Sequence, residues 1–331
     1  MAIFITHSPE ALNNYFGPKA LAGLEALGEV RRSTAGLADE EALIRAAQGC
    51  EIIIAERKTE CSAALLRALP DLVALCRCAV DIRNIDVKAA SSEGILVTQA
   101  SAGFMASVSE WIIGTMIDLG RNISSATQAY HRGEIPPARM GRELRGSTLG
   151  IIGYGQIGRY LAGLARAFGM DVCVSDPFAA PSGQDVRRVE LPQLLAQSDH
   201  VACLAVATPE TENLMGAREF AAMKPGAFFI NASRGNLVDE TALLHALDSG
   251  RVAGCALDVG RAPDQMPSPV LARHPHVIAT PHTGGLTLPA IEHQSLETVG
   301  QVAAILSGKI PQGAVNADHA SRMSRLQRGA P

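Results

Sequence analysis

Short apolar runs alternate with stretches of helical character along most of the chain, a pattern typical of parallel α/β sheets. Before residue 99 we predict helices at residues 18–28 and 63–69 and strands at residues 3–6, 51–55, 72–79 and 94–98. From residue 149 onward we predict a helix at residues 239–249 and strands at residues 149–152, 172–175, 200–205, 227–231, 253–257 and 277–279. Strands separated by helices predict right-handed crossovers. An apolar helix at residues 107–122 lies between the two series and suits a connection between domains.

The length of 331 residues suits two α/β domains better than one core. A net charge of −4 and a pI near 6.1 give no electrostatic case for binding nucleic acid or an anionic membrane. No run is long and apolar enough to span a membrane, and the first residues lack the features of a signal peptide. We therefore expect a cytoplasmic protein.

Seven scattered cysteines, an odd number, indicate reduced thiols. Cys76 and Cys78 alternate along a predicted strand and share a face, so we expect them in the core. The histidines lack the spacing of metal ligands, and we predict no metal site. From residue 318 onward apolar content is low, and we predict a mobile, solvated end whose basic residues are Arg322, Arg325 and Arg328.

The run Leu149-Gly-Ile-Ile-Gly-Tyr-Gly-Gln-Ile-Gly has the form of a strand, a glycine turn and the start of a helix. Gly153 permits the tight turn, Gly155 leaves room for a pyrophosphate at the helix N-terminus, and Gly158 lets the helix pack closely on the strand. Asp176 follows the next strand, where a carboxylate can bind both ribose hydroxyls and repel a 2′-phosphate. This arrangement predicts a dinucleotide site that prefers NAD to NADP.

Polar residues follow the predicted strands of the second series, at the end of a parallel sheet where ligands bind. They are Asp176, Thr208, Ser233, Arg234, Asp258 and His282. Arg234 offers a planar, charged fork that fits a carboxylate, although a solvent-exposed arginine at a helix start gives the same pattern. His282 can carry a proton near neutral pH, and its alternative is a loop histidine before two glycines. With a hydride carrier, Arg234 would anchor a carboxylate and polarise the neighbouring carbonyl, and His282 would handle the oxygen's proton.

Four motifs resemble those of the D-isomer-specific 2-hydroxyacid dehydrogenases: the glycine run, Asn231-Ala-Ser-Arg-Gly-Asn-Leu-Val-Asp-Glu, Ala256-Leu-Asp-Val and Thr280-Pro-His-Thr-Gly-Gly. The resemblance implies an α/β fold in which a Rossmann-type doubly wound parallel sheet is inserted into a second, smaller flavodoxin-like α/β domain. It further implies that residues 1–98 and 285–331 form the substrate domain. Residues 99–284 would form the NAD-binding domain, through which homodimers form.

The resemblance also implies roles for individual residues. Arg234 matches the substrate-binding arginine, and His282 matches the histidine that acts as acid and base. Asp258 matches the aspartate near the nicotinamide amide. The remaining positions that we assign to the cofactor site, by this match or by their place after a strand, are Gln156, Ile157, Thr208, Ala232, Ser233 and Gly284.

Three segments depart from the family's pattern, and one of them is the strand near Cys203, which lacks the family's usual His and Pro beside the pyrophosphate. The family carries a catalytic glutamate in Asp-Val-Phe-x-x-Glu-Pro, where it bonds the histidine and raises its pKa, but here Pro263 stands at that position. We predict that the adjacent Asp264 replaces the glutamate as a catalytic residue, the alternative being an exposed loop residue. In the substrate loop, Asp81 and Arg83 replace small or different residues, which indicates a polar pocket or a solvated pair.

The sequence therefore predicts an NAD-dependent oxidoreductase that interconverts a 2-hydroxy acid and its 2-keto acid. One alternative is a protein of this fold that senses NAD(H) with weak or no turnover, which the missing glutamate favours. By the same resemblance, another is oxidation of a non-carboxylate oxyanion such as phosphite. The pocket loops lack recognisable motifs.

Overall fold

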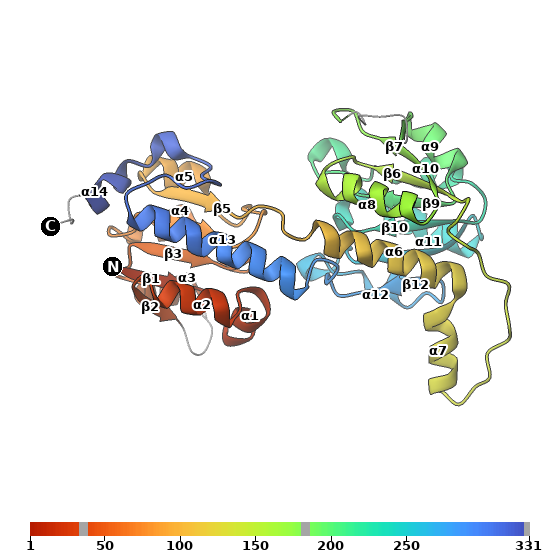
Figure 1. Ribbon diagram of the computed structural model, residues 1–331, viewed down its shortest axis with the longest axis horizontal. Helices are drawn as coiled ribbons and strands as arrows, with labels where there is room; N and C mark the ends of the chain where they lie inside the picture. Colours follow the sequence, from red (N-terminus) through yellow and green to blue (C-terminus); the bar gives the residue numbers. More distant parts are fainter. Residues whose placement is uncertain (33–38, 180–185, 328–331) are drawn as a thin grey trace. The chain divides into compact units, whose positions relative to one another are not determined.

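The computed structural model describes residues 1–32, 39–179 and 186–327. The chain divides into two compact units (Figure 1). The discontinuous unit consists of Met1–Phe104 and Leu286–Pro331, and the central unit is Met105–Gly285. Sequence analysis placed the boundaries after residues 98 and 284. In the described ranges no helix combines the length and the apolar character that crossing a membrane requires.

Five described strands form the sheet of the discontinuous unit, all parallel, in the order β2-β1-β3-β4-β5. This is the flavodoxin-like order that the resemblance implied. The strands are β1 Ala2–Ile5, β2 Glu29–Arg32, β3 Ile52–Ala55, β4 Ala74–Arg77 and β5 Leu96–Gln99. The helices are α1 Pro9–Tyr15, α2 Pro18–Glu25, α3 Glu40–Ala47, α4 Ala63–Ala68, α5 Val87–Ser92, α13 Leu288–Leu306 and α14 Ser324–Gln327. The long α13 packs on α2 and β4 (Figure 1).

Both faces of this sheet are buried. In β1, Ala2 and Phe4 join one apolar cluster, and Ile3 and Ile5 join the cluster on the opposite face. Because helices cover both faces, the inner strands have continuous apolar sequences, and the sequence analysis predicted them. The polar edge strand β2, with its partly exposed residues, was not predicted.

Cys76 and Cys78 lie in the core, which confirms the prediction. All seven cysteines fall within the described ranges and are free and buried. Burial raises the pKa of Cys76 to about 12 and that of Cys78 to about 11. These thiols therefore stay protonated at neutral pH and are poor nucleophiles.

The prediction of a mobile, solvated end was wrong for residues 318–327, which form two 3-10 turns and α14. Three apolar side chains of this segment are buried in the core: Ala320, Met323 and Leu326. The guanidinium of Arg322 is also buried and donates to backbone carbonyls after α4 and to Glu93 at 3.0 Å. A few apolar residues spaced three apart anchor the segment despite its low apolar content. Arg328 lies outside the described residues.

Seven described strands form the sheet of the central unit, all parallel, in the order β12-β11-β10-β9-β6-β7-β8. The chain starts at β6, runs to one edge, returns to β9 and continues to the other edge, which is the doubly wound Rossmann arrangement. The strands are β6 Thr148–Ile152, β7 Asp171–Ser175, β8 Arg187–Arg188, β9 His200–Cys203, β10 Ala227–Asn231, β11 Val252–Leu257 and β12 Val277–Ala279. The helices are α6 Met105–Arg121, α7 Ile123–His131, α8 Gln156–Ala167, α9 Leu191–Gln197, α10 Ala217–Ala222, α11 Glu240–Asp248 and α12 Pro269–Ala272.

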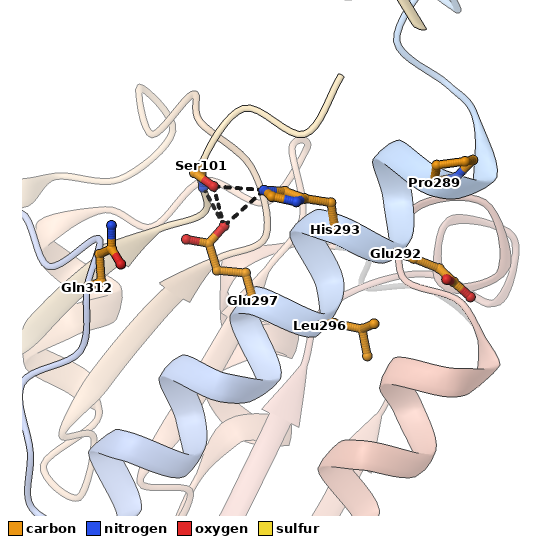
Figure 2. Close-up of a pocket in the computed structure, with 7 residues that line it drawn as sticks. All are labelled: Ser101, Pro289, Glu292, His293, Leu296, Glu297 and Gln312. Atoms are coloured by element: carbon orange, nitrogen blue, oxygen red, sulfur yellow. Dashed lines mark hydrogen bonds and ion pairs between the residues drawn. The ribbon is translucent and has the colours of Figure 1, made fainter. Parts of the chain in front are cut away.

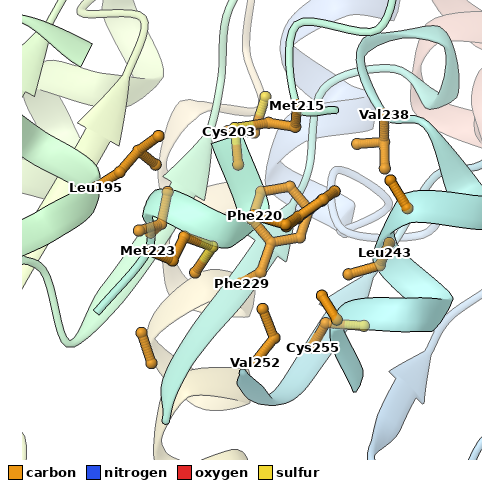
Figure 3. Close-up of a cluster of buried hydrophobic side chains, with 14 of the residues drawn as sticks. Leu195, Cys203, Met215, Phe220, Met223, Phe229, Val238, Leu243, Val252 and Cys255 are labelled. Carbon is orange, nitrogen blue, oxygen red and sulfur yellow. The ribbon is translucent and has the colours of Figure 1, made fainter. Parts of the chain in front are cut away.

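One apolar cluster of the central unit lies between its sheet and the helices on one face (Figure 3). Phe220 of α10 meets Phe229 of β10 edge to face, with ring centroids 5.3 Å apart. Each ring is at most 1% exposed. Such pairs fix the helices relative to the strands, and so they hold the loops after the strands in place.

The helix predicted at residues 107–122 is α6, but its predicted role as a connection between domains was wrong. The boundary between the units falls just before it, and α6 packs on α8 and β11 within the central unit. Ile112 and Met116 are fully buried there. A helix of this length and apolar character must pack against other elements along its whole length. A helix that only linked two domains would leave much of its apolar surface exposed.

Candidate functional site

The glycine loop after β6 lies where the strand order reverses between β6 and β9, the position at which doubly wound sheets bind ligands. Gly153 has a φ of +95°, and an added Cβ would lie 2.7 Å from the backbone of residue 204. A Cβ on Gly158 would lie 2.6 Å from the carbonyl oxygen of Gly153. Gly155, the N-cap of α8, faces open space instead. The loop therefore leaves an open cradle at the start of α8, whose first turn holds Gln156 and Ile157.

Asp176 directly follows β7, and its carboxylate is bound to the glycine loop. It accepts hydrogen bonds from the backbone N–H groups of Tyr154 (2.7 Å), Phe178 (2.8 Å) and Ala179 (2.8 Å). Partial burial raises the pKa of Asp176, but these hydrogen bonds outweigh it and lower the pKa overall. A carboxylate can accept about four hydrogen bonds, so this ionised group keeps acceptor capacity beside the cradle.

Other predicted cofactor residues lie in the loops after β9 and β10. Ser233 donates through its hydroxyl to the carbonyl of Ala205 at 2.6 Å, which joins the two loops. Ala232 is half-buried beside it. Thr208 lies further along the first loop, where its N–H donates to the hydroxyl of Thr211 at 2.8 Å.

Arg234 lies in the loop after β10, which the buried Asn231 holds in shape. The side-chain oxygen of Asn231 accepts from the N–H of Ser233 (3.1 Å), and its amide donates to the carbonyl of Arg234 (3.0 Å). The guanidinium of Arg234 donates to the carbonyl of Ser233 at 2.8 Å. Sequence analysis missed the role of Asn231. The signal was an asparagine at the end of an apolar strand, a residue type that strands disfavour.

Asp258 follows β11, is 4% exposed and binds the loop that carries His282. Its carboxylate accepts from the hydroxyl of Thr280 (2.6 Å) and from the N–H groups of Thr283 and Gly284 (2.8 Å each). A Cβ on Gly284 would lie 2.8 Å from the same carboxylate, so a larger residue there would displace the Asp258 side chain. Asp258 therefore orients the His282 loop, and its role near a nicotinamide stays a prediction.

His282 itself has a left-handed backbone, with a φ of +56°. Its Nδ1 lies 3.4 Å from the backbone carbonyl oxygen of Asp264. Pro263 begins the 3-10 turn Pro263–Gln265, and its apolar side chain offers the histidine no hydrogen-bond acceptor. The structure thus brings Asp264 next to His282 through the main chain, and a catalytic role for its carboxylate stays a prediction.

The strands β10, β11 and β12 are neighbours in the sheet, so the loops that carry Arg234, Asp258 and His282 follow adjacent strands at one edge. Side chains at such an edge can act on one small ligand. The arrangement offers a fixed cation, a proton carrier and a cradle for a pyrophosphate within one unit. Together these groups suit oxidoreduction of a small anion by a dinucleotide.

Asp81 and Arg83, in the discontinuous unit, pair with each other at the surface. Their shortest contact joins Arg83 Nη2 to Asp81 Oδ2 at 2.6 Å, and the arginine side chain is 68% exposed. This is the geometry of a solvated pair, which the sequence analysis left open beside a polar pocket.

A pocket of about 640 Å³ in the discontinuous unit holds none of the predicted site residues (Figure 2). The Ser101 hydroxyl makes hydrogen bonds to two side chains there: it lies 2.8 Å from His293 Nε2 and donates to Glu297 at 2.7 Å. A catalytic triad needs the acid at the other ring nitrogen, but Glu297 approaches Nε2, at 3.7 Å. This cluster therefore lacks the geometry of a nucleophile activated by a base.

Comparisons with known proteins agree with this geometry. The family description "D-isomer specific 2-hydroxyacid dehydrogenase, NAD binding domain" matches residues 113–284. The chain belongs to the D-isomer-specific 2-hydroxyacid dehydrogenase family. Its central unit therefore carries the family's NAD-binding domain.

Two relatives illustrate how far the similarity to this dehydrogenase family extends. D-3-phosphoglycerate dehydrogenase of Escherichia coli (strain K12) is 36% identical over 307 residues, which cover 90% of this chain and 74% of that protein. The enzyme of that name from Methanocaldococcus jannaschii is 34% identical over 302 residues, covering 90% of this chain but only 57% of the relative. The chain thus spans little more than half of the archaeal relative. The solved structure of D-lactate dehydrogenase from Escherichia coli superposes with a TM-score of 0.83 at 25% identity, covering 95% of this chain and all of that one.

Proposed function

We propose that this chain is an NAD-dependent oxidoreductase that interconverts a 2-hydroxy acid and its 2-keto acid. One observation carries the proposal. The loops with Arg234 and His282 follow β10 and β12, two strands of the sheet that also holds the glycine cradle at its switch point between β6 and β9. We assign the central unit to the cofactor and the discontinuous unit to the substrate. D-3-phosphoglycerate is the first acid to test, because both relatives are named for it.

The residues of the cradle fit NAD. Gly155 leaves open space at the helix start, and Asp176 supplies an ionised acceptor for ribose hydroxyls beside it. When bound, NAD supplies or accepts the hydride at the substrate carbon. The residues that we assign to holding it are Gly153, Gly155, Gln156, Ile157, Gly158, Asp176, Thr208, Ala232, Ser233, Asp258 and Gly284.

Arg234 and His282 divide the work on the substrate. The guanidinium of Arg234 binds the carboxylate and polarises the neighbouring carbonyl. Because Nδ1 of His282 faces a carbonyl oxygen, that nitrogen carries a hydrogen, and we assign Nε2 to the substrate oxygen. His282 Nε2 then donates a proton during reduction and accepts one during oxidation.

The test is oxidation of NADH, followed by absorbance, with a panel of 2-keto acids that includes 3-phosphohydroxypyruvate, pyruvate and glyoxylate. We expect turnover with at least one of them. Tight binding of NADH without turnover on any acid would contradict the proposal and favour a sensor of NAD(H), which the proline at position 263 makes the main rival. Reduction of NAD by phosphite alone would point to the oxyanion alternative.

Cofactor preference gives a first prediction. We expect kcat/KM to be at least about tenfold higher with NADH than with NADPH, because one factor of ten needs only ~1.4 kcal/mol of repulsion between Asp176 and a 2′-phosphate. Asp176→Ala should reduce that ratio. Asp171→Ala, at the opposite end of β7, should leave the ratio unchanged. Equal use of both cofactors by the wild type would show that Asp176 does not face the ribose.

A second prediction concerns Asp264 as the replacement for the family's glutamate. A carboxylate beside His282 stabilises the protonated imidazole, so Asp264→Asn should shift the pH profile of keto-acid reduction toward acid and lower kcat near neutral pH. Asparagine also tolerates the left-handed backbone at this position, φ +62°. Asp248→Asn, which removes a carboxylate that faces a different histidine, is the control. Superimposable profiles for Asp264→Asn and wild type would mean that His282 works without a carboxylate.

We also propose that the chain forms a homodimer through its central unit. The helix α7 and the extended segment after it leave the body of that unit (Figure 1). They expose several large apolar side chains, namely Ile123, Tyr130, Ile135 and Met140. Exposed apolar side chains gathered on one arm are typical of a subunit interface. Sedimentation velocity that returned the mass of a single chain, 34.7 kDa, would contradict a dimer.

A further inference from the structure

The 3-10 turn Pro263–Gln265 holds two consecutive left-handed residues. Asp264 has a φ of +62° and Gln265 a φ of +59°. Residues with a Cβ disfavour this conformation, and two in succession persist only where surrounding contacts fix them. The backbone closes the loop around them, because the N–H of Gly260 donates to the carbonyl of Gln265 at 2.9 Å.

Each of these two residues contacts a different functional loop. The carbonyl of Asp264 lies 3.4 Å from Nδ1 of His282. The side-chain oxygen of Gln265 accepts from the N–H of Gly235, the residue after Arg234, at 3.3 Å. One strained dipeptide therefore touches both the proton carrier's ring and the loop of the substrate-binding arginine.

The contact to Gly235 lies at a tightly packed junction of two loops. Gly235 is buried, and a Cβ on it would lie 2.0 Å from the carbonyl oxygen of Gly260, so the two loops are pressed together backbone to backbone. Without the Gln265 oxygen, the N–H of the buried Gly235 would lose the hydrogen-bond acceptor that the side chain supplies. The loop would then move to find another acceptor, and Arg234 would move with it.

We propose that Gln265 is a positioning residue that holds the Arg234 loop in the geometry that binds the substrate carboxylate. This inference rests on the proposed function, since it assigns a purpose to a residue of that same site. In this proposal Gln265 acts through Arg234, whose loop it contacts at Gly235. Its loss should therefore weaken substrate binding more than it slows the chemical step.

The test compares Gln265→Ala with Gln265→Glu, which keeps the accepting oxygen, and with Met266→Ala, which shortens the next side chain in the same loop. We expect Gln265→Ala to raise KM for the keto acid about tenfold, with a smaller fall in kcat and an unchanged dissociation constant for NADH. Gln265→Glu should restore KM to near the wild-type value, and Met266→Ala should not change it. If the alanine variant does not fold, Gln265→Gly carries the same test, because glycine adopts the left-handed conformation without strain.

Binding of oxamate, an unreactive analogue of a 2-keto acid, to the NADH complex is measured alongside turnover. If the wild type turns over a keto acid or binds oxamate, and Gln265→Ala does so equally well, the inference about Gln265 is wrong and the proposed function is unaffected. A loss in Gln265→Ala that Gln265→Glu does not restore also overturns it, since the accepting oxygen would then be irrelevant. The wild type could instead bind oxamate without turning over any keto acid, while Gln265→Ala binds oxamate about tenfold more weakly. That result would overturn the proposed function and support the inference about Gln265. A wild type that does neither overturns both.

Discussion

Replacing Arg234 with lysine is expected to lower kcat/KM for the 2-keto acid by roughly 10²-fold or more, corresponding to about 2.7 kcal/mol of transition-state stabilisation. Lysine keeps the positive charge but loses the planar fork that binds a carboxylate through two parallel hydrogen bonds. It also loses the contact from Nη1 to the carbonyl of Ser233, which holds the guanidinium over its own loop. The loss should fall on both KM and kcat, because the same group binds the carboxylate and polarises the carbonyl.

The measurement is steady-state kinetics with NADH in excess, and Arg218→Lys on the exposed face of α10 is the matched control. The dissociation constant for NADH should stay at the wild-type value in both variants. A lysine variant with near-wild-type kcat/KM would remove Arg234 from the site. It would also leave Gln265 with no substrate-binding residue to position.

The sequence predicted most of the strands because both faces of each sheet are covered. A strand such as β3, with Ile52, Ile53 and Ile54 fully buried, has a continuous apolar sequence that needs no tertiary knowledge to find. The strand β2 escaped prediction because it forms a sheet edge and is mostly polar. The segment after residue 318 was misread for a related reason. Its few apolar side chains and the buried Arg322 become informative only against a surface that other parts of the chain build.

The glycine loop could be read from the sequence because its requirements are local. Gly153 needs a positive φ, and Gly158 needs to lie close to the backbone of the loop. Both requirements appear in the sequence as the spacing of the glycines in the motif. The contacts of Asp258 with the His282 loop could not be read in this way. They join residues far apart in the chain, and only the pairing of β11 with β12 brings them together. Similarly, nothing local in Asp-Gln marks a left-handed dipeptide, since packing of neighbouring loops imposes it.

His282→Asn is expected to lower kcat for keto-acid reduction by roughly 10²- to 10⁴-fold, the usual contribution of a general acid or base. Asparagine is the right replacement because it adopts left-handed backbone more readily than most residues, and position 282 has a φ of +56°. The loop itself is held by Asp258 through Thr280, Thr283 and Gly284, none of which the substitution touches. The fold of the loop should therefore survive while the proton carrier is lost.

Binding can be separated from catalysis because Trp111 is the chain's sole tryptophan and lies beside this loop. Its ring is 3.6 Å from where a Cβ on Gly284 would be. Quenching of its fluorescence by NADH should give the same dissociation constant in His282→Asn as in the wild type. His245→Asn on α11 serves as the control for loss of a histidine elsewhere in the unit. If His282→Asn retained more than about a tenth of wild-type kcat, the proton would have to come from another group, and His282 would be a structural residue of the loop.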